Sequence, residues 1–301
     1  MTSWPTVAPE ATAPATDLTT DLAAGPAVLD PDERFDLAQH RAAIRRARLR
    51  RIGLGTAGLV VLLGLWQLIA VLLNDPVALP TAGATVQAFG HYLTHPYPSQ
   101  SKTLPGDLAI SLERILVGFA IGTVIGVTIG AAMSANQIIR QLIDPVIEGI
   151  RPLPPLAFIP LFIVWFGIGE LPKEVLLVFG TVPIMTVATV AALKEVPDDL
   201  RLSARTLGAA RGYTLVHVQI PAALPGIVTG MRFAMAGAWT SIVAAEMLAA
   251  TSGVGYLISQ AGSYLNTSLV FAGIITIAIT GLILDAGLRG LLLLVDPSRR
   301  S

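Results

Sequence analysis

The chain has 301 residues, no cysteine and no formal net charge; 53% of its residues are hydrophobic and only 13% are charged. Soluble domains carry about 25% charged residues, so this composition predicts a polytopic membrane protein. The lack of cysteine excludes disulfides, thiolate metal sites and cysteine nucleophiles.

Residues 1–40 are rich in alanine, proline, threonine and acidic residues, and they show almost no apolar periodicity, which predicts a disordered tail. Six arginines follow between Arg41 and Arg51, directly before the first apolar run. A nucleic-acid patch is one interpretation of this run, but a juxtamembrane anchor on the cytoplasmic side is favoured, so no nucleic-acid partner is expected. Residues 1–51 are therefore predicted to form a cytoplasmic tail that ends in a basic anchor.

Apolar runs long enough to cross about 30 Å of hydrocarbon predict six transmembrane helices. Between the first two, an external loop is expected to hold a short helix that begins after Thr81, its N-cap. Basic residues gather in the segments that this count places inside, whereas the outer loops carry only Lys102 and Lys173. Both termini are therefore expected in the cytoplasm, and residues 52–296 in one all-α transmembrane domain. The predicted spans are 52–73, 107–133, 143–166, 174–193, 221–249 and 268–295.

Four glycines of the second span lie four residues apart, so they form one stripe along a helix. Such a stripe lets another helix approach closely in lipid, which favours helix packing over a role in a pore. The stripe consists of Gly118, Gly122, Gly126 and Gly130.

Two features of the spans suggest a solute path. Pro152, Pro154 and Pro155 cannot continue an ordinary helix, so the third span is either an interrupted helix beside a path or a kinked helix that begins after Pro155. In the fifth span Glu246 stands alone, which makes it the candidate for a path-lining or gating role. Other charged residues of the spans are predicted to pair locally: Glu113 with Arg114, Glu148 with Arg151, and Asp285 with Arg289.

The sequence contains no G-x-x-x-x-G-K-[ST] phosphate loop, no G-x-S-x-G and no H-E-x-x-H. His91 and His95 have a spacing that is more typical of a solvated helix than of a metal site. The chain is therefore expected to bind no cofactor or metal and to be no enzyme. Its energy would have to come from an ion gradient or from another subunit.

The only long polar segment after the first span is 197–225. Its acidic start predicts a helix with Asp198 as N-cap that runs to about Leu207 and is interrupted by Gly208. Two short helices with a bend would form a cytoplasmic knob suited to a groove on a partner; an ordinary amphipathic loop is the alternative. The cationic residues of the segment are Arg201, Arg205, Arg211 and His217.

This segment resembles the cytoplasmic loop of ABC importer permeases, E-A-A-x3-G-x9-I-x-L-P. Gly208 and Pro221 have the spacing of that motif, whereas Leu202 and Ser203 replace its glutamate and an alanine. Longer runs, among them ARTLGAARG and DPVIEGIRPLPPLAFIPLFIVWFGIGE, are similar to the nitrate/sulfonate/taurine-type branch of the binding-protein-dependent transport family, from about Leu79 to Asp296. The aligned loop positions are Leu202, Ser203, Ala204, Gly208, Val218, Ile220 and Pro221.

The resemblance implies a type I ABC importer permease fold with its core at 107–296 and a coupling loop at 197–221. It also implies a second permease copy in a homodimer, two cytoplasmic ATPase subunits that hold ATP and Mg, and an external solute-binding protein. We hypothesise that Arg201, Arg205 and Arg211 pair with acids on the ATPase. The loop residues expected to meet the ATPase are Arg201, Leu202, Ser203, Ala204, Arg205, Thr206, Leu207, Gly208, Ala209, Ala210 and Arg211, and the motif ends with Val218, Ile220 and Pro221.

For function, the resemblance implies import of a small solute, with an anion such as a sulfonate, taurine or nitrate expected, across the cytoplasmic membrane. The alternative is a secondary transporter driven by an ion gradient through Glu246 and Asp285. A membrane-embedded enzyme has the least support, because no catalytic constellation is present.

Overall fold

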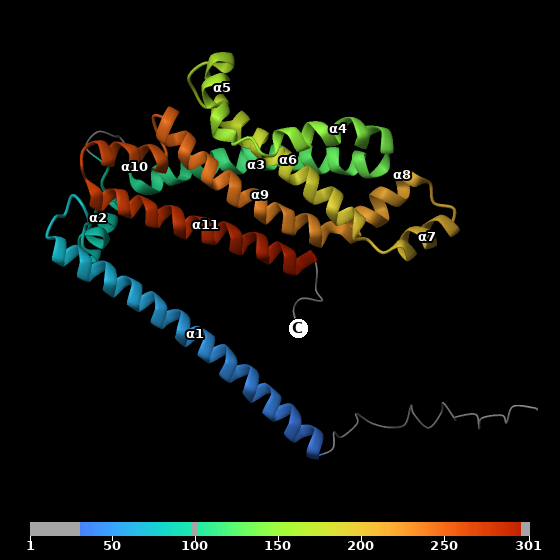
Figure 1. Ribbon diagram of the computed structural model, residues 1–301, viewed down its shortest axis with the longest axis horizontal. Coiled ribbons are helices and arrows are strands. Elements are labelled where there is room, and N and C mark those ends of the chain that lie inside the picture. Colours follow the sequence, from blue (N-terminus) through green and yellow to red (C-terminus); the bar gives the residue numbers. More distant parts are fainter. Residues whose placement is uncertain (1–30, 98–101, 296–301) are drawn as a thin grey trace, which may run out of the picture. The chain divides into compact units, whose positions relative to one another are not determined.

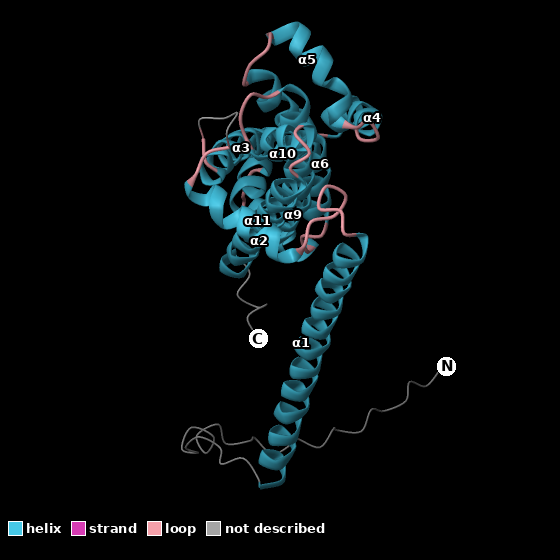
Figure 2. Cartoon of the chain, turned by 90° about the vertical axis from the view of Figure 1, so that its left-hand side faces the viewer, coloured by secondary structure: helices cyan, strands magenta, loops and turns pink. Residues whose placement is uncertain are grey.

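The computed structural model describes residues 31–97 and 102–295, which contain helices and no strand (Figures 1 and 2). The chain divides into two compact units, residues 1–64 and 65–301. Helix α1 (Pro31–Leu73) includes residues that were predicted to belong to the disordered tail. From residue 31 that expectation is wrong, because proline and acidic residues at the start, followed by an Ala/Arg/Leu-rich run, favour helix formation. The rest of the predicted tail, residues 1–30, lies outside the described residues.

Among the described residues, five helical segments are long and apolar enough to cross a membrane: 53–73, 104–135, 171–194, 211–249 and 267–295. The elements after α1 are α2 (Ala82–Thr94), α3 (Leu104–Ala135), α4 (Gln137–Ile150), the 3₁₀ turn η1 (Pro155–Phe158), α5 (Ile159–Phe166), α6 (Leu171–Lys194), α7 (Asp198–Thr206), α8 (Arg211–Thr214), the π-helical turn η2 (Leu215–Gln219), α9 (Ile220–Ala249), α10 (Val254–Ser263) and α11 (Thr267–Val295).

The third predicted span differs from the structure. Helix α4 begins at Gln137 instead of residue 143, because the Asn136 side chain caps it by accepting a hydrogen bond from the Ile138 amide at 2.8 Å. Helix α4 and the η1–α5 segment meet at an angle of 89° across residues 151–154 (Figure 1). They count as a sixth span only if the two pieces are taken together. Since helix lies on both sides of Pro152 and Pro154, the segment is an interrupted helix.

The centre of the second unit is built from α3, α6 and α9, which approach one another at small residues. The four glycines of the predicted stripe face α6: a Cβ added at Gly126 would lie 2.5 Å from the Met185 Cβ. Helix α9 approaches α6 equally closely, because a Cβ at Gly230 would lie 2.3 Å from the Ala188 Cβ. Close helix approach through small residues is the usual way in which transmembrane helices pack.

This packing leads to a stability prediction. Gly126→Ala and Gly230→Ala are each expected to lower the free energy of unfolding by about 1–3 kcal/mol, because the added methyl group has no room. Thermal unfolding of the purified protein in detergent measures the effect. Gly149→Ala is the matched control, since a Cβ there meets nothing within 4 Å. Equal melting temperatures for all three variants would contradict the packing.

Candidate functional site

The polar segment forms the knob, which we define as residues 197–219: α7, the bend at Gly208, α8 and η2. Figure 1 shows α7 and α8 together at one end of α6 and α9. Pro197 occupies the N-cap position of α7, so the prediction of Asp198 as N-cap was wrong by one residue. Asp198 and Asp199 instead lie in the first helical turn, where their charge favours the positive end of the helix dipole.

Gly208 reverses the chain between the two short helices. Its φ is +83°, a value that residues with a Cβ rarely adopt. The Ala209 amide donates to the Ala204 carbonyl at 3.0 Å and so closes the end of α7. The predicted bend is therefore a left-handed glycine at the C-terminal end of a helix.

The knob has an apolar tip, which we define as Leu202 and Leu207. Leu207 is 88% exposed and Leu202 is 59% exposed, and both border a shallow cavity with Asp199, Ser203 and Thr206. Two leucines so exposed on a polar segment are suited to burial against a partner. The arginines of α7 line a different cavity, so the helix presents two chemically distinct faces.

Arg201 joins the knob to α6. Its guanidinium donates from Nη2 to the Leu193 carbonyl at 3.0 Å and to the Val196 carbonyl at 3.2 Å. The Leu193 carbonyl lies in the last turn of α6 and the Val196 carbonyl just after it, where the helix itself supplies no donors. The hypothesised pairing of Arg201 with an acid on another subunit would compete with these bonds. The knob is therefore braced to a span by an arginine, although Leu202 replaces the glutamate of the family motif.

The end of the loop motif continues directly into α9. Pro221 was predicted to restart the chain as a span, but the helical segment runs from Arg211 to Ala249 through the π turn η2. Within it the Ile220 amide donates to the Leu215 carbonyl, one residue further back than in an α-helix. Pro221 has no N–H to donate, and the wider turn lets the helix continue past it. Leu215 and Ile220 pack against the core, which anchors the knob to α9.

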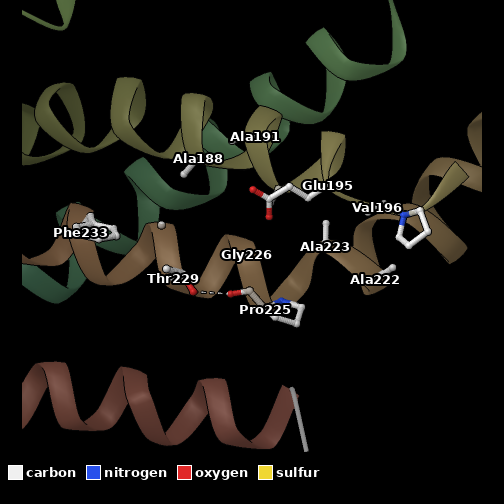
Figure 3. Close-up of a pocket in the computed structure, with 13 residues that line it drawn as sticks. Ala188, Ala191, Glu195, Val196, Ala222, Ala223, Pro225, Gly226, Thr229 and Phe233 are labelled. Atoms are coloured by element: carbon white, nitrogen blue, oxygen red, sulfur yellow. Dashed lines mark hydrogen bonds between the residues drawn. The ribbon is translucent and has the colours of Figure 1, made fainter. Parts of the chain in front are cut away.

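A cavity of about 450 Å³ lies between α6 and α9 beside the knob. Figure 3 shows the Glu195 carboxylate between the two helices, above a floor that includes Ala223 and Gly226. Thr229 lines the same cavity and donates its hydroxyl to the Pro225 carbonyl at 2.8 Å. Within residues 31–97 and 102–295, Glu195 makes no ion pair.

Glu246 lies in a buried polar network far from the knob in sequence. Its side chain is fully buried and accepts from the Arg114 guanidinium at 2.7 Å, from the Ser111 hydroxyl at 2.9 and 2.8 Å, and from the Gly255 amide at 3.0 Å. Glu246 therefore does not stand alone, and its side chain is fully buried in this conformation. A gating role for Glu246 remains a prediction.

Arg114 extends this network to two further segments. Its guanidinium binds both carboxylate oxygens of Glu170, and it donates to the Ser252 carbonyl at 2.8 Å and the Ser252 hydroxyl at 2.9 Å. Lys173, also buried, donates to Glu170 at 2.9 Å. Burial opposes the ionisation of Glu170, but the hydrogen bonds from Arg114 and Lys173 outweigh it and hold the pKa of this carboxyl below its ordinary value.

The turn between α9 and α10 is held by α3. The Asp107 carboxylate accepts from the Gly253 amide at 2.9 Å, and the Ser111 hydroxyl accepts from the Val254 amide at 3.0 Å. Gly253 has a φ of +109°, and a Cβ on it would lie 2.4 Å from the Glu246 carboxylate. The network therefore joins α3, α6, α9 and α10. Ser111 was not singled out from the sequence.

The predicted local charge pairs have different outcomes. Arg114 pairs with distant carboxylates and makes no ion pair with Glu113, and Glu148 and Arg151 are not paired in the described part of the chain. Asp285 does bind Arg289, at 2.8 Å, and it also binds Arg232 of α9 at 2.8 Å. Pro155 packs against Gly180 of α6, where a Cβ would lie 3.1 Å from its ring.

The helices and their apolar spans define a multi-pass membrane protein built around a closely packed helical core. The chain belongs to the family of binding-protein-dependent transport system inner membrane components, because residues 122–300 match the model of that family. It is thus the membrane-spanning permease subunit of an ABC importer.

Individual relatives agree with this assignment. The chain is 37% identical over 243 residues to the taurine transport system permease protein TauC of Escherichia coli, a match that covers 80% of this chain and 88% of the relative. It is 27% identical over 248 residues to the nitrate import permease protein NrtB of Synechococcus elongatus, covering 80% and 89%. A chain of the MetNI methionine ABC transporter in an inward-facing conformation shares the fold, with a TM-score of 0.58 and 22% identity over 64% of this chain and 96% of that one.

Proposed function

We propose that this permease imports a small sulfonate, with taurine as the first solute to test. The supporting observation is the ranking of its relatives: the taurine permease is 37% identical, two permeases for aliphatic sulfonates are 34% and 36% identical, and the nitrate permease is 27% identical. A chain of this kind does not hydrolyse ATP itself. Separate ATPase subunits would bind ATP and Mg, and an external protein would deliver the solute.

We further propose that the knob is the contact with the ATPase, on the cytoplasmic side together with both termini. Three features support this: the exposed apolar tip of Leu202 and Leu207, the brace of Arg201 on α6, and the direct continuation into α9. A force on the tip would then be passed to two spans at once. Two copies of the chain would surround the path, each with its own knob and ATPase.

The cavity between α6 and α9 is our candidate for a part of the path. Most of its lining residues are alanine or glycine at the ends of two spans, and Pro197 of the knob also lines it, so movement of the knob would change its width. The secondary-transporter alternative required titratable groups in a path at Glu246 and Asp285. In the structure both carboxylates form ion pairs with arginines. They are therefore not the free titratable groups on which this alternative depended.

The function is tested by uptake of radiolabelled taurine into liposomes that contain the permease. ATP-dependent uptake is expected only when the ATPase and the binding protein are both added. Competition by unlabelled sulfonates, nitrate and bicarbonate then ranks the solutes. Uptake by the permease alone, driven by a proton or sodium gradient, would overturn the proposal.

The candidate path is tested by Ala191→Trp, since Ala191 is exposed at the cavity. An indole there should obstruct the cavity and lower uptake by about tenfold or more, equivalent to about 1.4 kcal/mol on the barrier. The protein level in the membrane should stay unchanged. Ala57→Trp, on the exposed surface of α1, is the matched control and should transport normally. Normal uptake by Ala191→Trp would remove this cavity from the path.

A further inference from the structure

A third cavity, of about 200 Å³, lies where the end of α3 meets the knob. It is separate from the apolar tip and from the cavity between α6 and α9, and it shares no lining residue with either. None of its lining residues is acidic. The polar groups around it belong to Ser134, Arg201, Arg205, Arg211, Thr214 and Gln219.

Three guanidinium groups line this small cavity with little neutralising charge. Arg201 has one carboxylate oxygen of Asp198 at 3.4 Å, and its buried Nε has no hydrogen-bond partner. Arg205 and Arg211 make no ion pair with any residue that the structure describes. Like charges that line one cavity and are only partly neutralised repel one another, so an anion in the cavity would relieve that repulsion.

The available donors are the guanidinium groups of Arg205 and Arg211, the Nε of Arg201 and the side-chain amide of Gln219. The Ser134 hydroxyl already donates to the Gly130 carbonyl at 2.9 Å, and the Thr214 hydroxyl donates to the Ala210 carbonyl at 3.1 Å. Forked guanidinium donors match the oxygens of phosphate or sulfate and bind them with two parallel hydrogen bonds. The cavity borders Ser134 and Ala135, the last residues of the α3 span, a depth at which lipid phosphates lie.

We propose that this cavity binds a tetrahedral oxyanion through Arg201, Arg205 and Arg211. The source of the oxyanion is either the phosphate of an anionic lipid headgroup or a free phosphate or sulfate ion. A bound oxyanion would bridge the end of α3 to α7 and α8, and so hold the knob to a third span. The site is independent of the solute that the permease carries.

The first test uses the full-length permease in nanodiscs of neutral phosphatidylcholine. Inorganic phosphate, compared with chloride at equal ionic strength, is expected to raise the melting temperature by several degrees in a saturable way, since a ligand that binds only the folded state stabilises it. Arg205→Gln/Arg211→Gln should abolish the rise. Arg151→Gln/Arg289→Gln removes two exposed arginines elsewhere and should keep it. No phosphate-specific rise in the wild type, or the same rise in the Arg205/Arg211 double variant, would overturn the proposal.

The second test distinguishes the two sources of the oxyanion. The phosphate titration is repeated in nanodiscs that contain phosphatidylglycerol. If a lipid headgroup is the ligand, the wild type should no longer respond to phosphate there, and less phosphatidylglycerol should co-purify with Arg205→Gln/Arg211→Gln than with the control variant. An unchanged response to phosphate would identify the free ion as the ligand.

Discussion

Leu207→Asp is expected to abolish ATP-coupled uptake while the permease still inserts and folds. Leu207 is 88% exposed at the apolar tip of the knob, so the substitution removes no internal contact. On an ATPase, however, the new carboxylate would be buried without a partner, and truncations at such central contacts weaken binding by about 2–4 kcal/mol. Taurine uptake into proteoliposomes and co-purification of the ATPase measure the loss, which we expect to reach about a hundredfold in binding, equivalent to about 2.8 kcal/mol.

Val77→Asp is the matched control, because Val77 is also exposed but lies in the loop between α1 and α2. It should leave uptake and ATPase binding unchanged. Gly208→Pro should reproduce the loss by another route, since the proline ring cannot adopt a φ of +83° and the bend would be lost. Normal coupled uptake by Leu207→Asp would show that the tip is not the docking contact.

The second large effect is expected from Arg114→Leu, which should lower the free energy of unfolding by about 3–5 kcal/mol. The substitution leaves the fully buried Glu246 carboxylate without a cation and removes the bonds to Glu170 and Ser252. Thermal unfolding in detergent and the level of protein in the membrane report the change. Because most domains are stable by only about 5–15 kcal/mol, a large fraction of the protein should fail to accumulate.

A double variant separates the charge from the packing. Arg114→Leu/Glu246→Gln removes the uncompensated carboxylate but keeps an acceptor for Ser111 and Gly255, so it should be more stable than Arg114→Leu alone. Arg289→Leu is the control, because Arg289 is exposed and Asp285 keeps Arg232; its effect should stay within about 1 kcal/mol. If Arg114→Leu melts like Arg289→Leu, the network does not hold the helices together.

Sequence reasoning was strongest where the signal is local. Apolar runs of membrane length identified most of the spans, and the spacing of Gly118, Gly122, Gly126 and Gly130 identified a packing face that the structure places against α6. The two short helices of the knob and the bend at Gly208 also followed from nearby residues. Each of these features depends on residues within one or two helical turns of one another.

The failures have a common physical cause. Three features differed from the prediction: the start of α4, the helical part of the predicted tail and the passage of helix through Pro221. In each, neighbouring residues that favour a helix compete with residues that oppose it, and a single sequence pattern does not show which of them prevails. The cap on α4 is one example, since the Asn136 side chain starts the helix before its apolar stretch begins.

What the sequence determined by itself is that this protein spans a membrane through helices, with a glycine face for close packing and a polar knob between two of the spans. Only the tertiary structure decided what the charged residues do. Glu246 meets Arg114 across 132 residues of chain, and Arg201 turns back to the end of α6. The reason is that buried charges must find partners wherever the fold brings them, and those partners come from other helices at distances along the chain that no local pattern records.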